Sequence, residues 1–473
     1  MPNPNVLSQR YATDEMNAIF SEKGRILLER DLWIAVLKAQ KDLGLNIPDE
    51  AIEAYENAKT DIDLDLIKKI ERETRHDVKA KIAAFNKAAG GYELIHRGMT
   101  SRDLTDNVEQ MQVKKASKLI FGKYVSILRH FVDKAREYNS IILTARTHHQ
   151  PAQPTLLGRR FAMWAEELYE ALIDFERFIE NYPLRGIKGP VGTQSDMLTL
   201  LGSAKKVSEL ERRIAEHLGF KKVLDAPGQV YPRSLDYRLA SHLTALAAAC
   251  ENFAKGMRLM SGYELVTEGF KEGQVGSSAM PHKMNTRSSE RICGFCELLK
   301  MYADGASRLS GDQWEEGDVS CSVVRRVIIP DMFYASDGLC ETVLTVLNEM
   351  GVYPKVIAAE VERYLPFLST AELLDAATKK GMGREEAHSL IRKYAVKEAL
   401  RMRETGDFEN RLPELLGDDE RFPLSKDEIE QILKDKMHFV GRAKEQIQAA
   451  AEKAEKLISR YPSEAAYEPK PIL

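Results

Sequence analysis

The chain has 473 residues, of which 44% are apolar, so it is too long for a single compact core and two or three domains are expected. Its formal net charge is only -4, which argues against nucleic acid as a main partner because duplex binders usually carry a basic excess. No apolar stretch approaches the roughly 20 residues that a membrane span needs, and the polar N-terminal segment with two prolines does not resemble a signal peptide.

Helical periodicity dominates the chain, and convincing alternating strands are hard to find. The stripe over 239–260 steps by four and three residues, which is typical of a helix packed along a coiled-coil-like seam. Pro330 is expected to kink or interrupt the last long helix. The predicted long helices cover residues 120–138, 164–179, 239–260, 292–309 and 323–350.

Long helices of matched length pack side by side in a bundle, so the predicted fold is all-α with a central long-helix bundle. Polar, glycine-bearing connectors separate the helices and hold most of the candidate functional residues. We place domain boundaries near residues 100 and 351. The predicted domains are an N-terminal helical domain (1–100), the central bundle (101–351) and a smaller C-terminal helical domain (352–473).

The chain has five cysteines, an odd number at low density that fits a reducing cytoplasm better than a disulfide framework. Cys293 and Cys296 form a C-x-x-C pair, which raises the possibility of a zinc or redox site. A structural zinc site would need a second such pair, and no βαβ context surrounds this one. We therefore favour two helical cysteines, one of them on a buried stripe, and expect no metal.

The connector 271–287 carries the most information about chemistry. Its glycines, serines and proline predict a solvent-accessible loop that precedes a helix near Ser288. Backbone N–H groups, hydroxyls, Lys283 and Asn285 are donors suited to a carboxylate or an oxyanion. A plain serine-glycine linker fits the composition equally well.

A second connector contains the adjacent pair His148 and His149 beside proline-fixed turns. Adjacent histidines project in different directions, and neither an H-x-x-x-H spacing nor a carboxylate cluster supports a metal. An acid/base histidine is the better functional interpretation, because the pKa of histidine lies near neutrality. An ordinary turn histidine is the competing interpretation.

Two further charged segments are ambiguous. Residues 72–78 mix charges with His76 and are, taken alone, best interpreted as a solvated helix face. Residues 313–326 contain hydroxyls and the pair Arg325-Arg326. Arginines beside hydroxyls suit a phosphate, and a surface salt-bridge cluster is the alternative.

Residues 276–283, Gly-Ser-Ser-Ala-Met-Pro-His-Lys, resemble the signature loop of the fumarase/aspartase superfamily, whose members eliminate fumarate from succinyl compounds. Residues 147–153 resemble the T-H-x-Q-P-A-Q motif of its adenylosuccinate lyase branch. The similarity to that branch extends from residue 10 to near residue 440. Its other matches lie, in order, at residues 10–11, 75–78, 100–103, 228–231 and 352–357.

The resemblance implies a role for each matching residue. Ser277 would be the general base that removes the succinyl Cβ proton, His148 the general acid that protonates the leaving nitrogen, and His76 an aid to substrate placement and charge balance. The residues implied to bind the succinyl carboxylates are Lys283, Asn285, Thr100, Ser101, Thr147 and Gln229. Those implied to bind the nucleotide are Arg10, Tyr11, Arg291, Ser322 and Arg326, with Arg75 and Asp77 beside His76 also assigned to substrate.

The resemblance also implies a cytoplasmic homotetramer whose central domains form one multi-helix core and whose active sites draw on three subunits. The implied substrates are small succinylated purine nucleotides: adenylosuccinate, giving AMP, and SAICAR, giving AICAR, in purine nucleotide biosynthesis. No cofactor is implied. Met284 and Thr286 depart from the usual sequence of the branch's loop, so loop closure or turnover is expected to differ. Gly317 stands where some relatives carry an arginine, so the phosphate is expected to rely more on Arg326 and Arg291.

Two alternatives compete with this assignment. The chain could be another lyase or cycloisomerase of the superfamily, such as an argininosuccinate lyase or a carboxymuconate cycloisomerase, because the signature loop is shared. It could also be a non-catalytic helical assembly protein that retains the scaffold.

Overall fold

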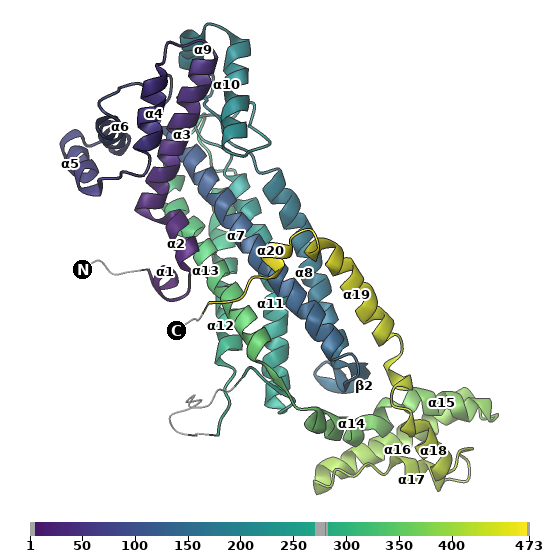
Figure 1. The fold of residues 1–473 in the computed structure, drawn as a ribbon. Helices are drawn as coiled ribbons and strands as arrows, with labels where there is room; N and C mark the ends of the chain where they lie inside the picture. The colour runs from purple at the N-terminus through teal and green to yellow at the C-terminus, as the bar shows by residue number, and fades with distance from the viewer. Residues whose placement is uncertain (1–4, 270–279, 281, 471–473) are drawn as a thin grey trace.

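Five long helices form the centre of the molecule, which is described by a computed structural model over residues 5–269, 280 and 282–470 (Figure 1). They contact one another in a closed ring, each helix packing on the next and α13 packing back on α7. The five are α7 (Ser101–Glu137), α8 (Leu157–Glu180), α11 (Ser234–Gly262), α12 (Arg287–Leu309) and α13 (Cys321–Glu349). The predicted all-α fold with a central long-helix bundle is confirmed.

The apolar stripes explain why these helices pack in a ring. Every stripe residue of α11, from Leu239 to Met260, is at most 2% exposed. Cys293 and Cys296 both lie in α12 as free thiols, with Cys296 buried. Of the kink or interruption expected at Pro330, the interruption is wrong, because α13 continues through the proline. The packing of α13 against α7 and α12 holds the helix there despite the missing N–H.

A short hairpin was not anticipated. β1 (Ile142–Thr147) pairs antiparallel with β2 (Gln150–Leu156), where the sequence suggested only a polar connector. Pro151 and Pro154 lie in β2, and prolines obscure a strand pattern because they cannot donate to the ladder. A second pair, β3 (Val266–Thr267) with β4 (Gly351–Val352), joins the end of α11 to the end of α13.

Smaller helices surround the ends of the bundle. At the end where α7 begins lie α3 (Glu22–Asp42), α4 (Asp49–Asn57), α5 (Leu64–Thr74), α6 (Asp77–Ala88), α9 (Ser195–Leu201) and α10 (Ala204–His217) (Figure 1). The short helices α1 (Val6–Arg10) and α2 (Asp14–Phe20) lie along its side. We call the end where α7, α11 and α13 begin the upper end, and the end with the hairpin the lower end, as in Figure 1.

The C-terminal part leaves the bundle at the lower end and then returns to it. A separate apolar cluster forms among its first helices, with Leu373, Leu412 and Ile429 fully buried. These helices are α14 (Pro354–Leu368), α15 (Thr370–Lys379), α16 (Arg384–Thr405), α17 (Leu412–Gly417) and α18 (Lys426–Lys434). After the 3-10 helix η1 (His438–Val440), α19 (Ala443–Ile458) packs along α7 and α8, and α20 (Pro462–Ala465) packs on α7. The predicted division into three domains stays a prediction.

A buried ion cluster ties α13 to α7 inside the bundle. Lys123, which is 1% exposed, pairs with Asp337 and lies 2.7 Å from the Glu341 carboxylate. Asp337 also accepts hydrogen bonds from the backbone N–H and the hydroxyl of Thr13, at 2.7 and 2.8 Å. The cluster is therefore satisfied, as a buried charge must be. Within the described residues, no helix combines the length and the apolar character needed to cross a membrane.

Candidate functional site

Thr100 and Ser101 stand at the N-terminus of α7, where a buried carboxylate fixes the backbone. The Asp103 carboxylate accepts from the Thr100 N–H at 2.8 Å, closing a capping box. Both Asp103 and Arg185 are fully buried, and their side chains pair at 2.6 Å. The same carboxylate accepts from the N–H groups of Lys188 and Gly189, at 2.8 and 3.0 Å. Asp103 thereby holds the start of α7 against the 185–189 loop.

Arg185 extends this arrangement to Gln229. It donates to the Gly228 carbonyl at 3.1 Å, and the Gln229 N–H donates to the Glu316 carbonyl at 2.7 Å. The structure therefore brings the 228–231 motif beside Thr100 and Ser101, and packs the 313–318 loop on it. Gly317, which has a φ of 144°, lies against Val230, where a side chain would crowd the loop.

The pair Arg325-Arg326 splits into two environments. Arg325 is buried and donates to Asp236 and Glu109, each at 2.7 Å. Burial opposes its charge, but these carboxylates raise the pKa of Arg325 well above its ordinary value. Arg325 therefore forms salt bridges, as the alternative interpretation expected, but these are buried and not on the surface. Arg326 is exposed and Ser322 partly exposed, so both remain available to a ligand at the upper end.

His76 lies in the turn between α5 and α6, also on the upper side of the molecule (Figure 1). Its Nδ1 accepts from the Lys79 N–H at 3.2 Å, so it caps α6 while half of its side chain stays exposed. Arg75 takes a left-handed φ of 53° that ends α5, and Asp77 begins α6 3.9 Å from the His76 ring. The exposure of residues 72–76 agrees with a solvated segment, but His76 lies in the turn between the two helices and not on a helix face.

His96 is a residue that the sequence analysis did not single out. Its Nδ1 accepts from the Trp33 indole N–H at 3.1 Å, and it has a left-handed φ of 65°. Burial lowers the pKa of His96, while Asp103 raises it in part and His76 lowers it further. His96 is thus close enough to both Asp103 and His76 for their charges to act on it. A lone histidine in a loop offers little signal in sequence, because its burial and partners come from distant segments.

Tyr11 and Arg291 come together on the side of the bundle. The Tyr11 ring contacts Phe295 edge to face, with centroids 5.1 Å apart, and the Arg291 guanidinium lies 5.7 Å from the Tyr11 centroid. A Cβ at Gly338 would lie 2.7 Å from the Tyr11 Cβ, so this glycine admits the tyrosine. Arg10 is exposed beside them at the end of α1.

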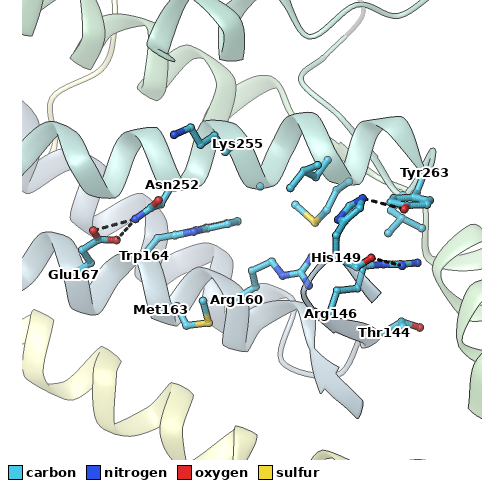
Figure 2. Close-up of a pocket in the computed structure, with 14 residues that line it drawn as sticks. Thr144, Arg146, His149, Arg160, Met163, Trp164, Glu167, Asn252, Lys255 and Tyr263 are labelled. Atoms are coloured by element: carbon cyan, nitrogen blue, oxygen red, sulfur yellow. Dashed lines mark hydrogen bonds between the residues drawn. The ribbon is translucent and has the colours of Figure 1, made fainter. Parts of the chain in front are cut away.

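Thr147 and His148 lie at the lower end, exposed at the tip of the hairpin. His148 and His149 have φ angles of 51° and 61°. The His149 Nε2 lies 3.1 Å from the Tyr263 hydroxyl (Figure 2).

Lys283 and Asn285 precede α12 at the same end of the bundle as the hairpin. The start of α12 is held by Glu268, whose carboxylate accepts from the N–H groups of Ser288 and Ser289, at 2.8 and 3.0 Å. A carboxylate at a helix N-terminus is favourable, since it satisfies free N–H groups and the helix dipole. Ser277 lies outside the described residues.

The predicted residues therefore fall into separate groups. At 1.5 Å per residue, the 37 residues of α7 span about 55 Å between Thr100 at one end and the hairpin at the other. The upper group (His76, Thr100, Ser101, Gln229, Ser322, Arg326) and the lower group (Thr147, His148, Lys283, Asn285) cannot meet within one chain. Over residues 5–269, 280 and 282–470, no group of histidine, cysteine, aspartate or glutamate side chains is placed to hold a metal.

A cavity of about 500 Å³ lies behind the hairpin, between α8 and α11 (Figure 2). Arg146, His149, Arg160, Trp164 and Tyr263 are among its lining residues. Of the site residues predicted from sequence, none that the structure describes lines it. The cavity is therefore distinct from the predicted site, although it shares the hairpin with it.

Comparison with known proteins adds independent information. The Lyase family model matches residues 9–298, and the model for the adenylosuccinate lyase C-terminus matches residues 366–450. The adenylosuccinate lyase of Saccharomyces cerevisiae is 36% identical over 94% of this chain and 93% of its own length. The adenylosuccinate lyase of Schizosaccharomyces pombe is 35% identical over the same shares.

Solved structures share the fold. The 3-carboxy-cis,cis-muconate lactonizing enzyme from Pseudomonas putida superposes with a TM-score of 0.80, covering 96% of this chain and 99% of that one, at 19% identity. A fumarate lyase from Mesorhizobium has a TM-score of 0.78 at 18% identity, covering 95% of this chain and 100% of that one. Identity this low supports a common architecture and not a common substrate.

Proposed function

The chain belongs to the adenylosuccinate lyase family, and on this premise we propose that it eliminates fumarate from adenylosuccinate, giving AMP, and from SAICAR, giving AICAR. It is a carbon–nitrogen lyase that releases fumarate. The observation that carries the proposal is the 36% identity to the adenylosuccinate lyase of Saccharomyces cerevisiae over 94% of this chain. A lactonizing or cycloisomerase activity has only the low-identity structural likeness in its favour.

The chemistry requires a base on one side of the succinyl arm and an acid on the other. The proton on Cβ is very weakly acidic, so the carbanion needs donors aimed at the neighbouring carboxylate, over which its charge spreads. We assign Lys283, Asn285, Thr100, Ser101, Thr147 and Gln229 to the succinyl carboxylates. We assign removal of the proton to Ser277, whose alkoxide requires hydrogen-bond donors around it. His148 protonates the leaving nitrogen, and His76 assists substrate placement.

We assign the nucleotide to Arg10, Tyr11, Arg291, Ser322 and Arg326. Arg75 and Asp77, which flank His76, are also assigned to substrate binding. Support comes from the contact of Arg291 with the Tyr11 ring and from the exposure of Arg326. A guanidinium is suited to a phosphate because it donates two parallel hydrogen bonds. Arg325, already bound to two carboxylates, is not available for this role.

We assign the active form to a homotetramer whose sites combine residues from different copies. The separation of the upper and lower groups along α7 supports this assignment, because only a neighbouring copy can bring His148 to Thr100. Large apolar side chains exposed on the bundle, among them Leu259, Met301 and Val323, support a partner surface on α11, α12 and α13. A cytoplasmic location is proposed from the five cysteines, all of which are free.

The test is fumarate release by the purified protein from adenylosuccinate, with argininosuccinate and carboxymuconate as competing substrates. Ser277→Ala and His148→Ala should each lower kcat by a factor of about 100 or more, while the tetramer persists. His388→Ala is the matched control, since His388 is an exposed histidine on α16, and it should leave kcat unchanged. The function is refuted if the native protein releases no fumarate from adenylosuccinate. The residue assignment is refuted if both alanine variants keep native turnover.

A further inference from the structure

His148 and His149 are the two central residues of the hairpin turn. They follow one another in the left-handed region, with φ angles of 51° and 61°. Thr147 pairs with Gln150 on either side of them, so the connection is a two-residue hairpin loop, which favours positive φ at both central residues. A residue with a Cβ adopts this conformation at some cost, so contacts of the turn with its surroundings help to hold it.

Those contacts converge on His149, the neighbour of the proposed acid. Its Nε2 lies 3.1 Å from the Tyr263 hydroxyl, and its carbonyl accepts from the Arg146 guanidinium at 3.4 Å (Figure 2). Arg146 in turn lies 4.4 Å over the centre of the Tyr263 ring and pairs with Glu360 of α14. Tyr263 therefore meets both the side chain of His149 and the guanidinium that holds its carbonyl.

We propose that Tyr263 is a positioning residue for catalysis, which fixes His149 and thereby aims the adjacent His148 into the active site. The inference rests on the proposed function, in which His148 is the general acid. Tyr263 itself contacts His149 and Arg146, so it acts through the hairpin and not on the substrate. Either tautomer of His149 can form the bond, because a tyrosine hydroxyl both donates and accepts.

The position of Tyr263 in the chain also supports its role as a positioning residue. It is the residue that ends α11, and the chain runs from it through β3 toward the signature loop. Glu268, five residues later, holds the start of α12 through Ser288 and Ser289. The segment that anchors the hairpin is thus also bound to the helix that follows the signature loop. Tyr263 places the acid relative to that segment.

Tyr263 and His149 are both accessible to solvent, so an effect on catalysis can be measured separately from an effect on protein stability. Tyr263 is 41% exposed and His149 is exposed, so water can replace their hydrogen bond in the folded protein. A bond of this kind contributes little to the free energy of unfolding. By contrast, displacing a reacting group by a fraction of an ångström to 1 Å slows catalysis strongly. Loss of the bond should therefore change kcat and leave the thermal unfolding temperature unchanged.

The experiment compares Tyr263→Phe with Tyr237→Phe, a control within α11 that has the same 41% exposure. Tyr263→Phe should lower kcat about tenfold, with KM within about twofold and Tm unchanged. His149→Ala should match it, and His149→Gln, which keeps a polar group near the Nε2 position, should recover most of the loss. The double variant Tyr263→Phe/His149→Ala should be no slower than either single variant, because both remove one interaction.

A second measurement does not depend on activity. Amide hydrogen exchange over residues 147–150 should be faster in Tyr263→Phe than in the native protein and unchanged in Tyr237→Phe. The inference is overturned if exchange at the tip is unaffected, if kcat of Tyr263→Phe equals the native value, or if kcat falls only in proportion to lost folded protein. If the native protein releases no fumarate but the exchange result holds, the proposed function fails while the Tyr263 contact stands.

Discussion

Two inactive variants of this chain should restore activity when they assemble together, provided that their defects lie at opposite ends of α7. We consider His76→Ala, in the turn before α6, and His148→Ala, at the hairpin tip. The 37 residues of α7 separate these ends by about 55 Å, whereas groups that act on one succinyl arm lie within a few ångströms of it. One copy therefore cannot supply both histidines to the same site.

The size of the recovery follows from random assembly. In an equal mixture, a site that takes His76 from one copy and His148 from another receives two native residues in about one quarter of cases. The mixed tetramers should then reach about a quarter of native kcat, with native KM in the recovered sites. If one copy supplied both residues, every site would lack one of them and no activity would return.

The assay is fumarate release after co-expression of the two variants with different affinity tags and purification through both tags. A matched control combines His76→Ala with Thr100→Ala, two changes at the upper end that one copy contributes together, and this mixture should stay inactive. The reasoning is refuted if the first mixture forms mixed tetramers without activity, or if the control recovers to the same level.

Three further predictions concern stability. Lys123→Met should lower the free energy of unfolding in urea by about 3–5 kcal/mol, because it leaves two carboxylates of α13 buried without a cation; no change in the denaturation midpoint would contradict this. Asp103→Asn should lower the free energy of unfolding, measured by thermal denaturation, by about 3–5 kcal/mol, because Arg185 keeps a buried charge without its carboxylate. A native Tm would contradict this prediction. Burial lowers the pKa of His96 in the folded protein, so the unfolded chain binds a proton there more tightly. The free energy of unfolding should therefore decrease as the pH falls below about 6.5, the ordinary pKa of histidine. His96→Gln should therefore flatten the acid side of a plot of Tm against pH, and an unchanged slope would exclude this account.

The long helices could be predicted from the sequence because a packed helix requires apolar residues at regular, short intervals along the chain. Leu239 to Met260 recur at intervals of four and three, and all of them are buried in α11. The family could also be predicted, since the signature loop and the T-H-x-Q-P-A-Q motif consist of consecutive residues. Pro330 shows the limit of such local rules, because tertiary packing keeps α13 continuous through it.

The hairpin and the buried partners could not be predicted in the same way. Prolines in β2 hid the strand pattern, and the Tyr263–His149 contact joins residues 114 positions apart. Asp103 appeared in the sequence only as part of a motif, whereas in the fold it binds the start of α7 to Arg185 and the 188–189 backbone. Such contacts depend on the positions that distant connectors take in the folded chain. The periodic pattern of apolar residues does not specify those positions.

By itself, the amino-acid sequence determined the helical class, the buried stripe of each long helix and the residue types available for eliminating fumarate. These are local properties, set by the helical repeat and by short motifs. The tertiary structure alone decided which of those residues share an end of the bundle, because helix length and direction set where each connector emerges. The length of α7 separates His148 from Thr100, and for this reason the proposed active site requires a second copy of the chain.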